Sequence, residues 1–431
     1  MTIPPNVDLP DRPEHDSLPS NWKIEPLREL CYKPEYGYTE SAVLEPVGPR
    51  FLRITDIQNG RVDWHTVPYC PCLETDARKY RLAKGDLLVA RIGATTGKTF
   101  YIEDCPPAVF ASYLIRLRPR TIDGQFLYYF CQSDLYWSQI NAGKGEKLKG
   151  GVSGGTLSEI EVNVPPPPEQ SQIASLLRKL ERLVGHQEDL VDRLCDLKTV
   201  VTAKLFSEGL RRERLKESEF GPIPESWDAI TLRERCYLKS GGTPSRTIPD
   251  YWNGDVPWVK TTEIDYRDIM ATEEKVTQAG LQNSSAKVFD KGTLLMAMYG
   301  QGVTRGRVAI LGLPAATNQA CAAFFPDETL SSRYLYAYFT YAYDHIRQIG
   351  HGANQQNLSL ELLQGIKIPL PKTVTEQEEI FSVISTVQKR IEAAEKKRDT
   401  LRDLFRATLD TLMTGKVRVT ALDAPAEASN V

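Results

Sequence analysis

The sequence lacks the long apolar stretches and the leader segment that membrane and secreted proteins carry. None of its apolar runs approaches the roughly 20 residues that a helix needs to cross a bilayer. The first residues, Met-Thr-Ile-Pro-Pro-Asn, show neither the basic start nor the apolar core of a secretion signal. We therefore expect a cytoplasmic protein that does not associate with a membrane.

Metal-binding and disulfide patterns are also missing. The eight cysteines include no C-x-x-C pair, and the closest two, Cys70 and Cys72, have no histidine or further cysteine at metal-ligand spacing. The five histidines form no such pair either. We expect reduced, mostly buried thiols and no bound metal.

Common catalytic motifs are absent as well. The chain contains no H-E-x-x-H, no G-x-S-x-G, and no Asn/Asp-Pro-Pro-aromatic segment of the kind that forms the base pocket of adenine methyltransferases. Residues 93–99 look like a phosphate-binding loop, but three residues separate the two glycines where that loop needs four. The later segment 302–307 lacks the Lys-Ser/Thr ending. We predict a chain that is not an enzyme and binds no cofactor itself.

The overall charge is slightly negative, which argues mildly against a nucleic-acid partner. The net charge is −3 and the isoelectric point is about 6.1. Charge is unevenly distributed, however: residues 81–120 carry seven Lys/Arg against three Asp/Glu, and residues 287–319 carry four against one. A protein that is acidic overall can still present basic faces.

The strongest positive signal is an internal repeat of about 205 residues. Residues 18–31 return as residues 223–236 with six of fourteen positions identical, and residues 84–93 return as 291–300 with six of ten identical. A period of this length is too long for a solenoid and indicates two copies of one module. Each copy has a globular part, a proline-rich stop at residues 165–168 or 369–371, and a charged segment.

The shared positions are mostly apolar residues, glycine and proline, whereas polar loops differ between the copies. Residues 91–98 in the first copy correspond to the dissimilar residues 298–307 in the second. Apolar runs at residues 51–55, 87–90, 108–115 and 306–310 predict strands, and residues 126–139 and 332–348 predict helices. We expect α+β domains at residues 18–168 and 215–372, with tails at 1–17 and 416–431. Two binding domains of different specificity fit this pattern, and so does simple duplication followed by neutral drift.

Two long helices are predicted at residues 169–214 and 373–415. Apolar residues recur there every seven positions in two rows, with charges between them, which is typical of a helix that pairs with another helix. Gln187 and Arg398 interrupt the rows, and such polar positions often fix register. The pairing residues we expect are Ile173, Leu176, Leu180, Leu183, Gln187, Leu190, Leu194 and Leu197 with Ile380, Ile384, Val387, Ile391, Arg398, Leu401 and Phe405.

Pairing of the two helices would organise the whole chain. The repeat predicts an antiparallel coiled coil that separates two similar domains about a pseudo-twofold axis. A helix of about 45 residues would be roughly 68 Å long, which is about two turns of B-DNA at roughly 34 Å each.

In combination these motifs resemble the DNA-specificity subunits of type I restriction–modification systems. The resemblance extends from about residue 18 to residue 419. It rests on the doubled I/L-P-x-x-W and K-G-x-L-L segments, the proline stop before E-Q-x-x-I at 169–173 and 376–380, and the link at 220–227. It implies two target-recognition domains that each read half of a bipartite double-stranded DNA site. It also implies two modification (methyltransferase) subunits, docked on the helices, and restriction (translocase/nuclease) subunits; these partners would carry S-adenosylmethionine, ATP and Mg.

Candidate DNA contacts follow from the side-chain chemistry that base edges and phosphates require. Arginine and lysine suit guanine and phosphate, and asparagine and glutamine suit adenine. In the first domain the candidates are Arg53, Arg91, Thr95, Thr96 and Lys98, with Lys144, Lys147 and Lys149 suited to phosphates. In the second domain they are Lys260, Thr262, Tyr299, Gln301, Thr304, Arg305, Arg307, Asn318, Gln319, His351, Asn354 and Gln355.

Two alternatives stay open at this point. The chain could be a duplicated coiled-coil scaffold that joins proteins without touching DNA, which its acidic isoelectric point favours. It could also be an enzyme with an unrecognised site, although neither copy carries a paired catalytic motif. Gel-shift titration with modification subunits present would distinguish DNA binding from scaffolding.

Overall fold

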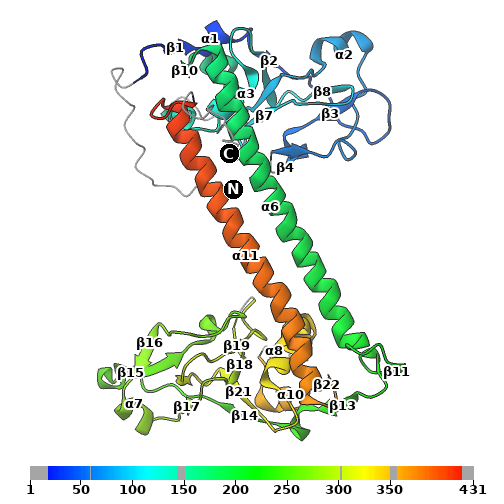
Figure 1. Ribbon diagram of the computed structural model, residues 1–431, viewed down its shortest axis with the longest axis vertical. Helices are drawn as coiled ribbons and strands as arrows, with labels where there is room; N and C mark the ends of the chain where they lie inside the picture. The colour runs from blue at the N-terminus through cyan, green and yellow to red at the C-terminus, as the bar shows by residue number, and fades with distance from the viewer. Residues whose placement is uncertain (1–17, 59, 143–150, 301–302, 350–356, 420–431) are drawn as a thin grey trace, which may run out of the picture. The chain divides into compact units, whose positions relative to one another are not determined.

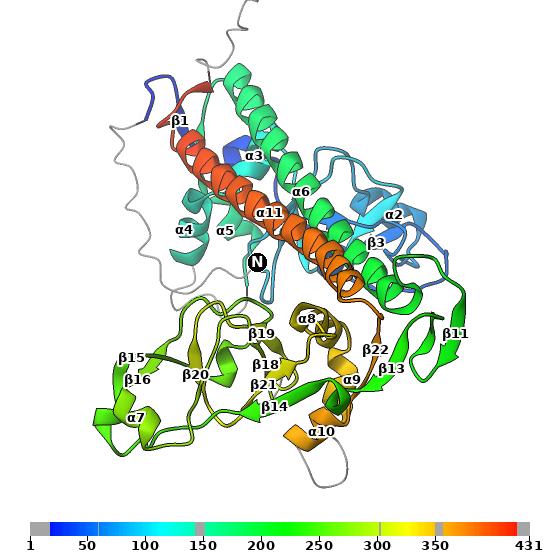
Figure 2. The same ribbon diagram turned by 60° about the horizontal axis from the view of Figure 1, so that its bottom comes forward.

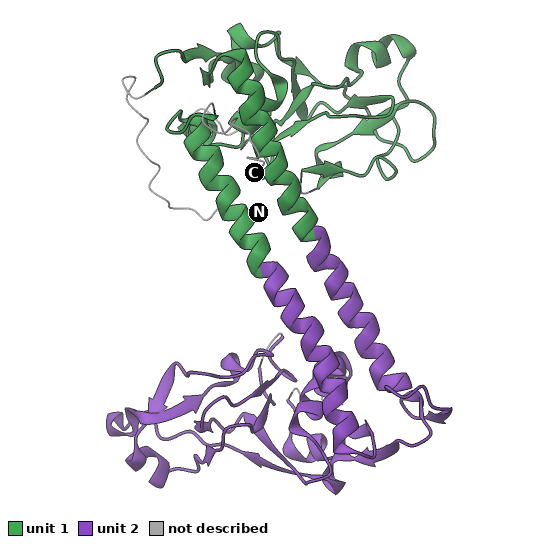
Figure 3. Cartoon of the chain, in the orientation of Figure 1, with its two compact units in different colours: residues 1–188, 396–431 green, residues 189–395 purple. Residues whose placement is uncertain are grey.

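The computed structural model describes residues 18–58, 60–142, 151–300, 303–349 and 357–419. The chain divides into two compact units, Met1–Glu188 with Lys396–Val431, and Asp189–Glu395 (Figure 3). The division falls within two long helices, so each unit contains one globular domain and part of both helices. In the described part of the chain, no helix has both the length and the apolar character needed to span a membrane.

The domain of the first unit is built on a four-stranded sheet with the order β2-β9-β6-β7. Its strands are β2 (Glu35–Tyr36), β9 (Leu114–Leu117), β6 (Leu87–Ala90) and β7 (Thr99–Tyr101). All four residues of β6 are buried, because helices and loops cover both faces of this apolar run. The sheet thus places the β6–β7 turn, which holds the polar loop of residues 91–98, at one of its ends.

Short strands and helices complete this domain. Strand β1 (Lys23–Pro26) pairs with β10 (Glu161–Val164), β3 (Arg50–Leu52) runs parallel to β8 (Ala108–Phe110), and β4 (Ile57–Gln58) pairs with β5 (Arg61–Val62). The helices are α1 (Leu27–Leu30), α2 (Glu74–Tyr80), α3 (Gly124–Phe130), α4 (Asp134–Ala142) and α5 (Gly154–Ser158). Asp123 caps α3 by accepting from the backbone N–H groups of Gln125 and Phe126, which fixes where that helix begins.

The second unit repeats this architecture. Its sheet has the order β14-β21-β18-β19, made of β14 (Cys236–Ser240), β21 (Cys321–Pro326), β18 (Leu294–Ala297) and β19 (Val308–Ile310). The registers agree as well: Ala90 pairs with Leu114 in the first unit, and Ala297 pairs with Cys321 in the second. An offset of 207 residues relates both partners, so the sequence repeat is a repeat of backbone structure.

The second domain differs by a larger accessory sheet with the order β16-β15-β20-β17. Its strands are β16 (Glu274–Val276), β15 (Trp252–Val259), β20 (Ala315–Thr317) and β17 (Val288–Phe289). Strand β13 (Asp228–Thr231) pairs with β22 (Lys367–Leu370), and β11 (Leu215–Ser218) pairs with β12 (Gly221–Pro224). The helices are α7 (Gln278–Gln282), α8 (Ser332–Tyr341), α9 (Tyr343–Ile349) and α10 (Leu360–Gln364). The expected α+β class is confirmed for both domains.

The two long helices are α6 (Pro167–Glu208) and α11 (Val374–Met413), and they pair antiparallel as predicted (Figures 1 and 2). Helix α6 ends at Glu208, six residues before the expected boundary at 214. Gly209 follows it with φ +65°, and Gly415 follows α11 with φ +71°. Glycine enters this left-handed conformation without steric cost, so it ends a helix efficiently.

One of the two expected rows of α6 is more exposed than the heptad pattern suggested. In the first row Ile173 and Gln187 are buried and Leu180 and Leu194 are half-buried, whereas Leu183, Leu190 and Leu197 of the second row are 50%, 44% and 47% exposed. The second buried row lies one position further along, at Leu177, Val184, Val191, Lys198 and Leu205, of which Leu177, Val191 and Leu205 are at most 6% exposed. Ile173 and Leu177 belong to the core of the first domain and Leu205 to that of the second, so both ends of this row are buried against a domain.

Helix α11 follows the prediction more closely. Ile380, Ile384 and Ile391 are buried, and Val387, Arg398, Leu401 and Phe405 are half-buried. Polar contacts also join the helices: Arg402 pairs with Glu188 in the first unit, and Lys198 donates to Gln388 at 2.7 Å in the second.

Hydrogen bonds made by the repeated Trp and Glu-Gln motifs attach the start of each long helix to its domain. In the first unit the indole N–H of Trp22 donates to Glu169 at 3.1 Å, and Arg418 donates to the same carboxylate at 2.5 and 2.8 Å. In the second unit Trp227 donates to Glu376 at 3.3 Å, and Arg211 lies 3.9 Å from it. Each arginine follows the C-terminal end of one long helix and meets the N-terminal end of the other.

The neighbouring glutamines make an equivalent pair of contacts. The side chain of Gln170 accepts from the backbone N–H of Asp123 and donates to Pro165. Gln377 accepts from the N–H of Ser331 and donates to Pro371. Because Glu169, Gln170, Glu376 and Gln377 are all at most 4% exposed, these polar groups depend on each other for hydrogen bonds. The four contacts fix the direction in which each helix leaves its domain.

Candidate nucleic-acid interface

The polar loop of the first domain is a tight turn between β6 and β7. Hydrogen bonds of 2.8 Å run from the Ala90 N–H to the Lys98 carbonyl and from the Gly97 N–H to the Ala90 carbonyl. Gly93 and Gly97 both have positive φ, at +81° and +90°, which lets the chain reverse. The turn leaves Arg91 and Lys98 exposed and Thr95 and Thr96 half-buried. Four of the predicted contact residues are therefore brought together on one turn.

Arg53 lies elsewhere in this domain and is already engaged. It precedes the short 3₁₀ helix Ile54–Asp56, and its guanidinium donates to Asp56 at 2.7 and 3.1 Å. The hydrogen bond that Arg53 donates to Asp56 is the main reason that the pKa of Arg53 is raised. A phosphate or base would have to compete with this carboxylate for the guanidinium.

Lys260 occupies the equivalent place in the second domain and is also paired. It precedes the 3₁₀ helix Thr261–Glu263, and its ammonium lies 2.6 Å from Glu273 and 3.5 Å from Glu274. The hydrogen bond that Lys260 donates to Glu273 is the main reason that the pKa of Lys260 is raised. Thr262, on the same short helix, is exposed.

The polar loop of the second domain holds its arginines differently. Arg305 is only 6% exposed and donates to the backbone carbonyl of Arg347, so a base contact would require this side chain to leave its position. Arg307 is half-buried and paired with Asp265. Tyr299 is 42% exposed and Thr304 is half-buried.

Asn318 and Gln319 lie just before β21. The Asn318 carbonyl oxygen accepts from the backbone N–H of Ala320 at 3.1 Å, and Gln319 is exposed and accepts from the Thr243 hydroxyl. Seven candidates lie outside the described residues: Lys144, Lys147, Lys149, Gln301, His351, Asn354 and Gln355.

Five exposed tyrosines in the described parts of these domains were not among the predicted contacts: Tyr32, Tyr36, Tyr113, Tyr237 and Tyr341. Tyr36 and Tyr113 flank Arg91 in the first domain and are 42% and 53% exposed. Tyr237 on β14 is 59% exposed. The sequence did not mark these tyrosines as DNA contacts, because tyrosine is common in β-strands and nothing in the local pattern distinguishes a binding residue from an ordinary strand residue.

Within the described ranges, no group of three or more His, Cys, Asp and Glu side chains could hold a metal ion. All eight cysteines are free thiols, and five of them are buried. Burial raises the pKa of Cys31 and of Cys236 to about 12, which keeps both as unreactive thiols at neutral pH.

Comparison with known proteins assigns the chain to a family. The model of the type I restriction modification DNA specificity domain matches residues 19–191 and 224–402. The putative type I restriction enzyme MjaX specificity subunit of Methanocaldococcus jannaschii is 25% identical over 420 residues, which cover 94% of this chain and 96% of that protein. The EcoR124I/EcoR124II specificity subunit of Escherichia coli is 22% identical over 285 residues, or 61% of this chain and 66% of that protein.

Solved structures agree on the fold. The S subunit of a type I restriction-modification system from M. genitalium superimposes with a TM-score of 0.59 at 16% identity, covering 91% of this chain and 96% of that one. A chain from a study of assembly and conformational transition in the type I R-M system gives a TM-score of 0.54 at 17% identity, covering 93% and 99%. The chain therefore belongs to the type I restriction modification DNA specificity family, as a non-catalytic specificity subunit that contains two copies of the specificity domain.

Proposed function

We propose that each domain reads one half of a bipartite double-stranded DNA target, and that the helix pair carries two modification subunits. The observation that supports this most directly is the contrast between backbone and loops. The two domains share sheet order and strand register, whereas the turn at residues 91–98 and its counterpart at 298–307 differ in length, charge and burial. One scaffold with two different polar surfaces suits two different half-sites.

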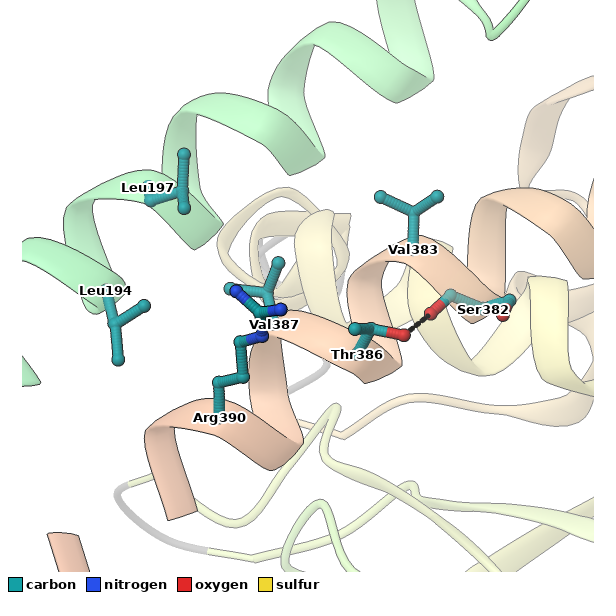
Figure 4. Close-up of a pocket in the computed structure, with 7 residues that line it drawn as sticks. All are labelled: Leu194, Leu197, Ser382, Val383, Thr386, Val387 and Arg390. Atoms are coloured by element: carbon teal, nitrogen blue, oxygen red, sulfur yellow. Dashed lines mark hydrogen bonds between the residues drawn. The ribbon is translucent and has the colours of Figure 1, made fainter. Parts of the chain in front are cut away.

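The helices provide an apolar surface suited to a protein partner. In the second unit Leu190, Leu197 and Val200 of α6 and Val383 of α11 are 37–54% exposed, although large apolar side chains are usually covered. Next to them lies a groove of about 250 Å³ between the two helices (Figure 4). Its walls are formed by Leu194, Leu197, Ser382, Val383, Thr386, Val387 and Arg390. Such a groove accepts the apolar ridge of another helix.

The partners would supply the chemistry that this chain lacks. Modification subunits would bind S-adenosylmethionine and methylate adenine, and restriction subunits would join through them with ATP and Mg. The specificity subunit itself would contribute the choice of sequence. Its acidic isoelectric point of about 6.1 is compatible with this role because the exposed cations Arg91 and Lys98 lie together on one turn.

The proposal is tested by methylation in the assembled complex. The chain, purified with its modification subunits, should methylate DNA only at a two-part motif, and exchange of residues 18–168 for the equivalent domain of a relative should change one half of that motif. A complex that binds all DNA sequences equally would support a scaffold without sequence recognition. Methylation by this chain alone would contradict its role as a non-catalytic subunit.

The docking surface is tested separately. Leu197→Asp places a charge in the groove and should weaken capture of the modification subunit, measured by titration and size-exclusion chromatography. Val417→Asp is the matched control, since Val417 is similarly exposed, at 48%, but lies beyond the end of α11. Equal loss of binding in both variants would contradict the assignment of this groove.

A further inference from the structure

Arg91 differs from the other candidate arginines in the environment of its guanidinium. Arg53 and Arg307 are paired with carboxylates, and Arg305 is buried against a backbone carbonyl. Arg91 is exposed, and in the part of the chain that the structure describes it has no carboxylate partner. Its guanidinium instead lies over the ring of Tyr36, with 5.1 Å between the guanidinium carbon and the ring centroid.

The backbone of Arg91 is held firmly on both sides. Its N–H donates to the carbonyl of Tyr113, and its carbonyl accepts from the N–H of Val152, both at 2.9 Å. Gly151 packs so closely that a Cβ atom there would lie 2.3 Å from the Arg91 carbonyl oxygen. The side chain therefore projects from a fixed point, which is what directional recognition requires.

Tyr36 is fixed in turn at both ends. Its backbone is in β2, opposite Ile115 of β9, and its hydroxyl accepts from the N–H of Gly154 at 2.9 Å, at the start of α5. A ring held at both ends gives the guanidinium a flat surface and leaves the N–H groups at the guanidinium edge available to donate.

The second domain has the same backbone without this pair. Met298 takes the place of Arg91: its N–H donates to the carbonyl of Ala320 at 2.8 Å, and its carbonyl accepts from the N–H of Leu358 at 3.0 Å. Ser240, opposite Ala322 in the equivalent strand pair, takes the place of Tyr36. Met298 is 3% exposed, so this position is part of the core there. The tyrosine and the arginine are thus present together in one domain and absent together in the other.

We propose that Tyr36 positions the Arg91 guanidinium to read a guanine in the half-site of the first domain. The inference rests on the proposed function, because it assumes that this domain contacts bases. An arginine fork matches the O6 and N7 acceptors of guanine in the major groove, and stacking on a fixed ring reduces the freedom lost on binding. Tyr36 is a positioning residue and Arg91 makes the base contact.

The test measures binding of the complex with modification subunits to its methylated motif and to all single-base changes of that motif. Arg91→Ala should lose about five- to a hundred-fold of discrimination at one G·C pair in one half-site, with the other half-site unchanged. Arg91→Lys keeps the charge but not the fork, so it should lose most of the same discrimination while the salt dependence of binding stays the same.

Tyr36 is tested by two variants of different severity. Tyr36→Ser copies the second domain and should lose part of the discrimination at the same base pair, with no additional loss in the Arg91→Ala background. Tyr36→Phe retains the ring and should retain most of the discrimination at that base pair. Lys98→Ala is the matched control on the same turn and should weaken all sequences equally.

Three results would overturn the proposal. Uniform loss of affinity in Arg91→Ala, with a salt slope reduced by about one, would assign Arg91 to a phosphate. Unchanged discrimination in Tyr36→Ser would leave the tyrosine a structural residue. Equal discrimination in Arg91→Lys and the unmodified protein would rule out the bidentate contact. A complex without any sequence preference would instead contradict the proposed function itself.

Discussion

The hydrogen bond between Trp227 and Glu376 joins the second domain to the start of α11, and we predict that Glu376→Ala destabilises this unit by about 2 kcal/mol. Trp227 is fully buried and Glu376 is 2% exposed, so water cannot replace the lost acceptor. A buried donor left without a partner costs about 1–3 kcal/mol. Arg211 lies 3.9 Å from the same carboxylate with its side chain 54% exposed, and its loss should add little.

The expected shift in melting temperature follows from the size of the unit. The second unit spans Asp189–Glu395, and for 150–250 residues each kcal/mol corresponds to about 2–4 °C. Glu376→Ala should therefore lower the transition by about 4–8 °C in scanning calorimetry, with tryptophan fluorescence followed in parallel. Glu376→Gln keeps an oxygen that can accept from the indole and should lose less than half as much.

The reasoning would be refuted by either of two results. If Glu376→Ala shifts the transition by less than about 1 °C, the indole does not depend on this acceptor. If Glu376→Gln lowers the melting temperature as much as Glu376→Ala, the negative charge of Glu376 stabilises the unit and its hydrogen bond to Trp227 does not. Glu169→Ala is the matched variant in the first unit, where Trp22 depends on the equivalent carboxylate.

Three further predictions concern other parts of the chain. Burial, more than any other factor, raises the pKa of Glu181, whose carboxylate accepts from Tyr128 and Tyr129 and is also influenced by Glu103 and Arg178. Because the folded protein then holds the proton more tightly than the unfolded chain, stability should fall as pH rises from about 4.5 through the raised value, and Glu181→Gln should flatten this dependence in melting curves. A variant as pH-dependent as the original would contradict this assignment. In thiol labelling of the native protein, Cys195 should react first, because it is exposed while Cys31, Cys70, Cys131, Cys236 and Cys321 are buried. Mass spectrometry after brief maleimide treatment should locate the label. Faster labelling at a buried cysteine would show that its domain opens. Deletion of a few residues within 185–200 should change the spacer between half-sites in the methylated motif, and an unchanged spacer would count against a helix pair that sets this distance.

Much of the architecture could be predicted from the sequence because each structural pattern occurs in both copies of the repeat. Apolar runs such as residues 87–90 alternate with glycine and aspartate turns, and the structure confirms a buried strand there. The proline stops and heptad rows predicted two long helices and their antiparallel pairing. These signals are local in sequence, and they depend on backbone propensity and hydrophobic period more than on distant contacts.

Tertiary structure alone decided which face of α6 is buried. A heptad pattern identifies apolar residues by their spacing alone. Leu183, Leu190 and Leu197 have the same seven-residue spacing as the residues that are buried, although they are exposed in the structure. The first domain also packs on Ile173 and Leu177, and the core of the second domain includes Leu205, so contacts with the domains add to those of the helix pair. Residues so far apart in sequence cannot reveal such a preference through periodicity.

The state of each polar side chain was decided in the same way. Sequence composition marks Arg53, Arg91, Arg305 and Arg307 as equivalent cations, but the folded chain pairs two of them with carboxylates, buries one and stacks one on Tyr36. Charge and hydrogen-bonding capacity belong to a residue type and can be read from the sequence. The partners that use them are brought together only when distant strands meet, so the tertiary structure determines which cations remain available for DNA.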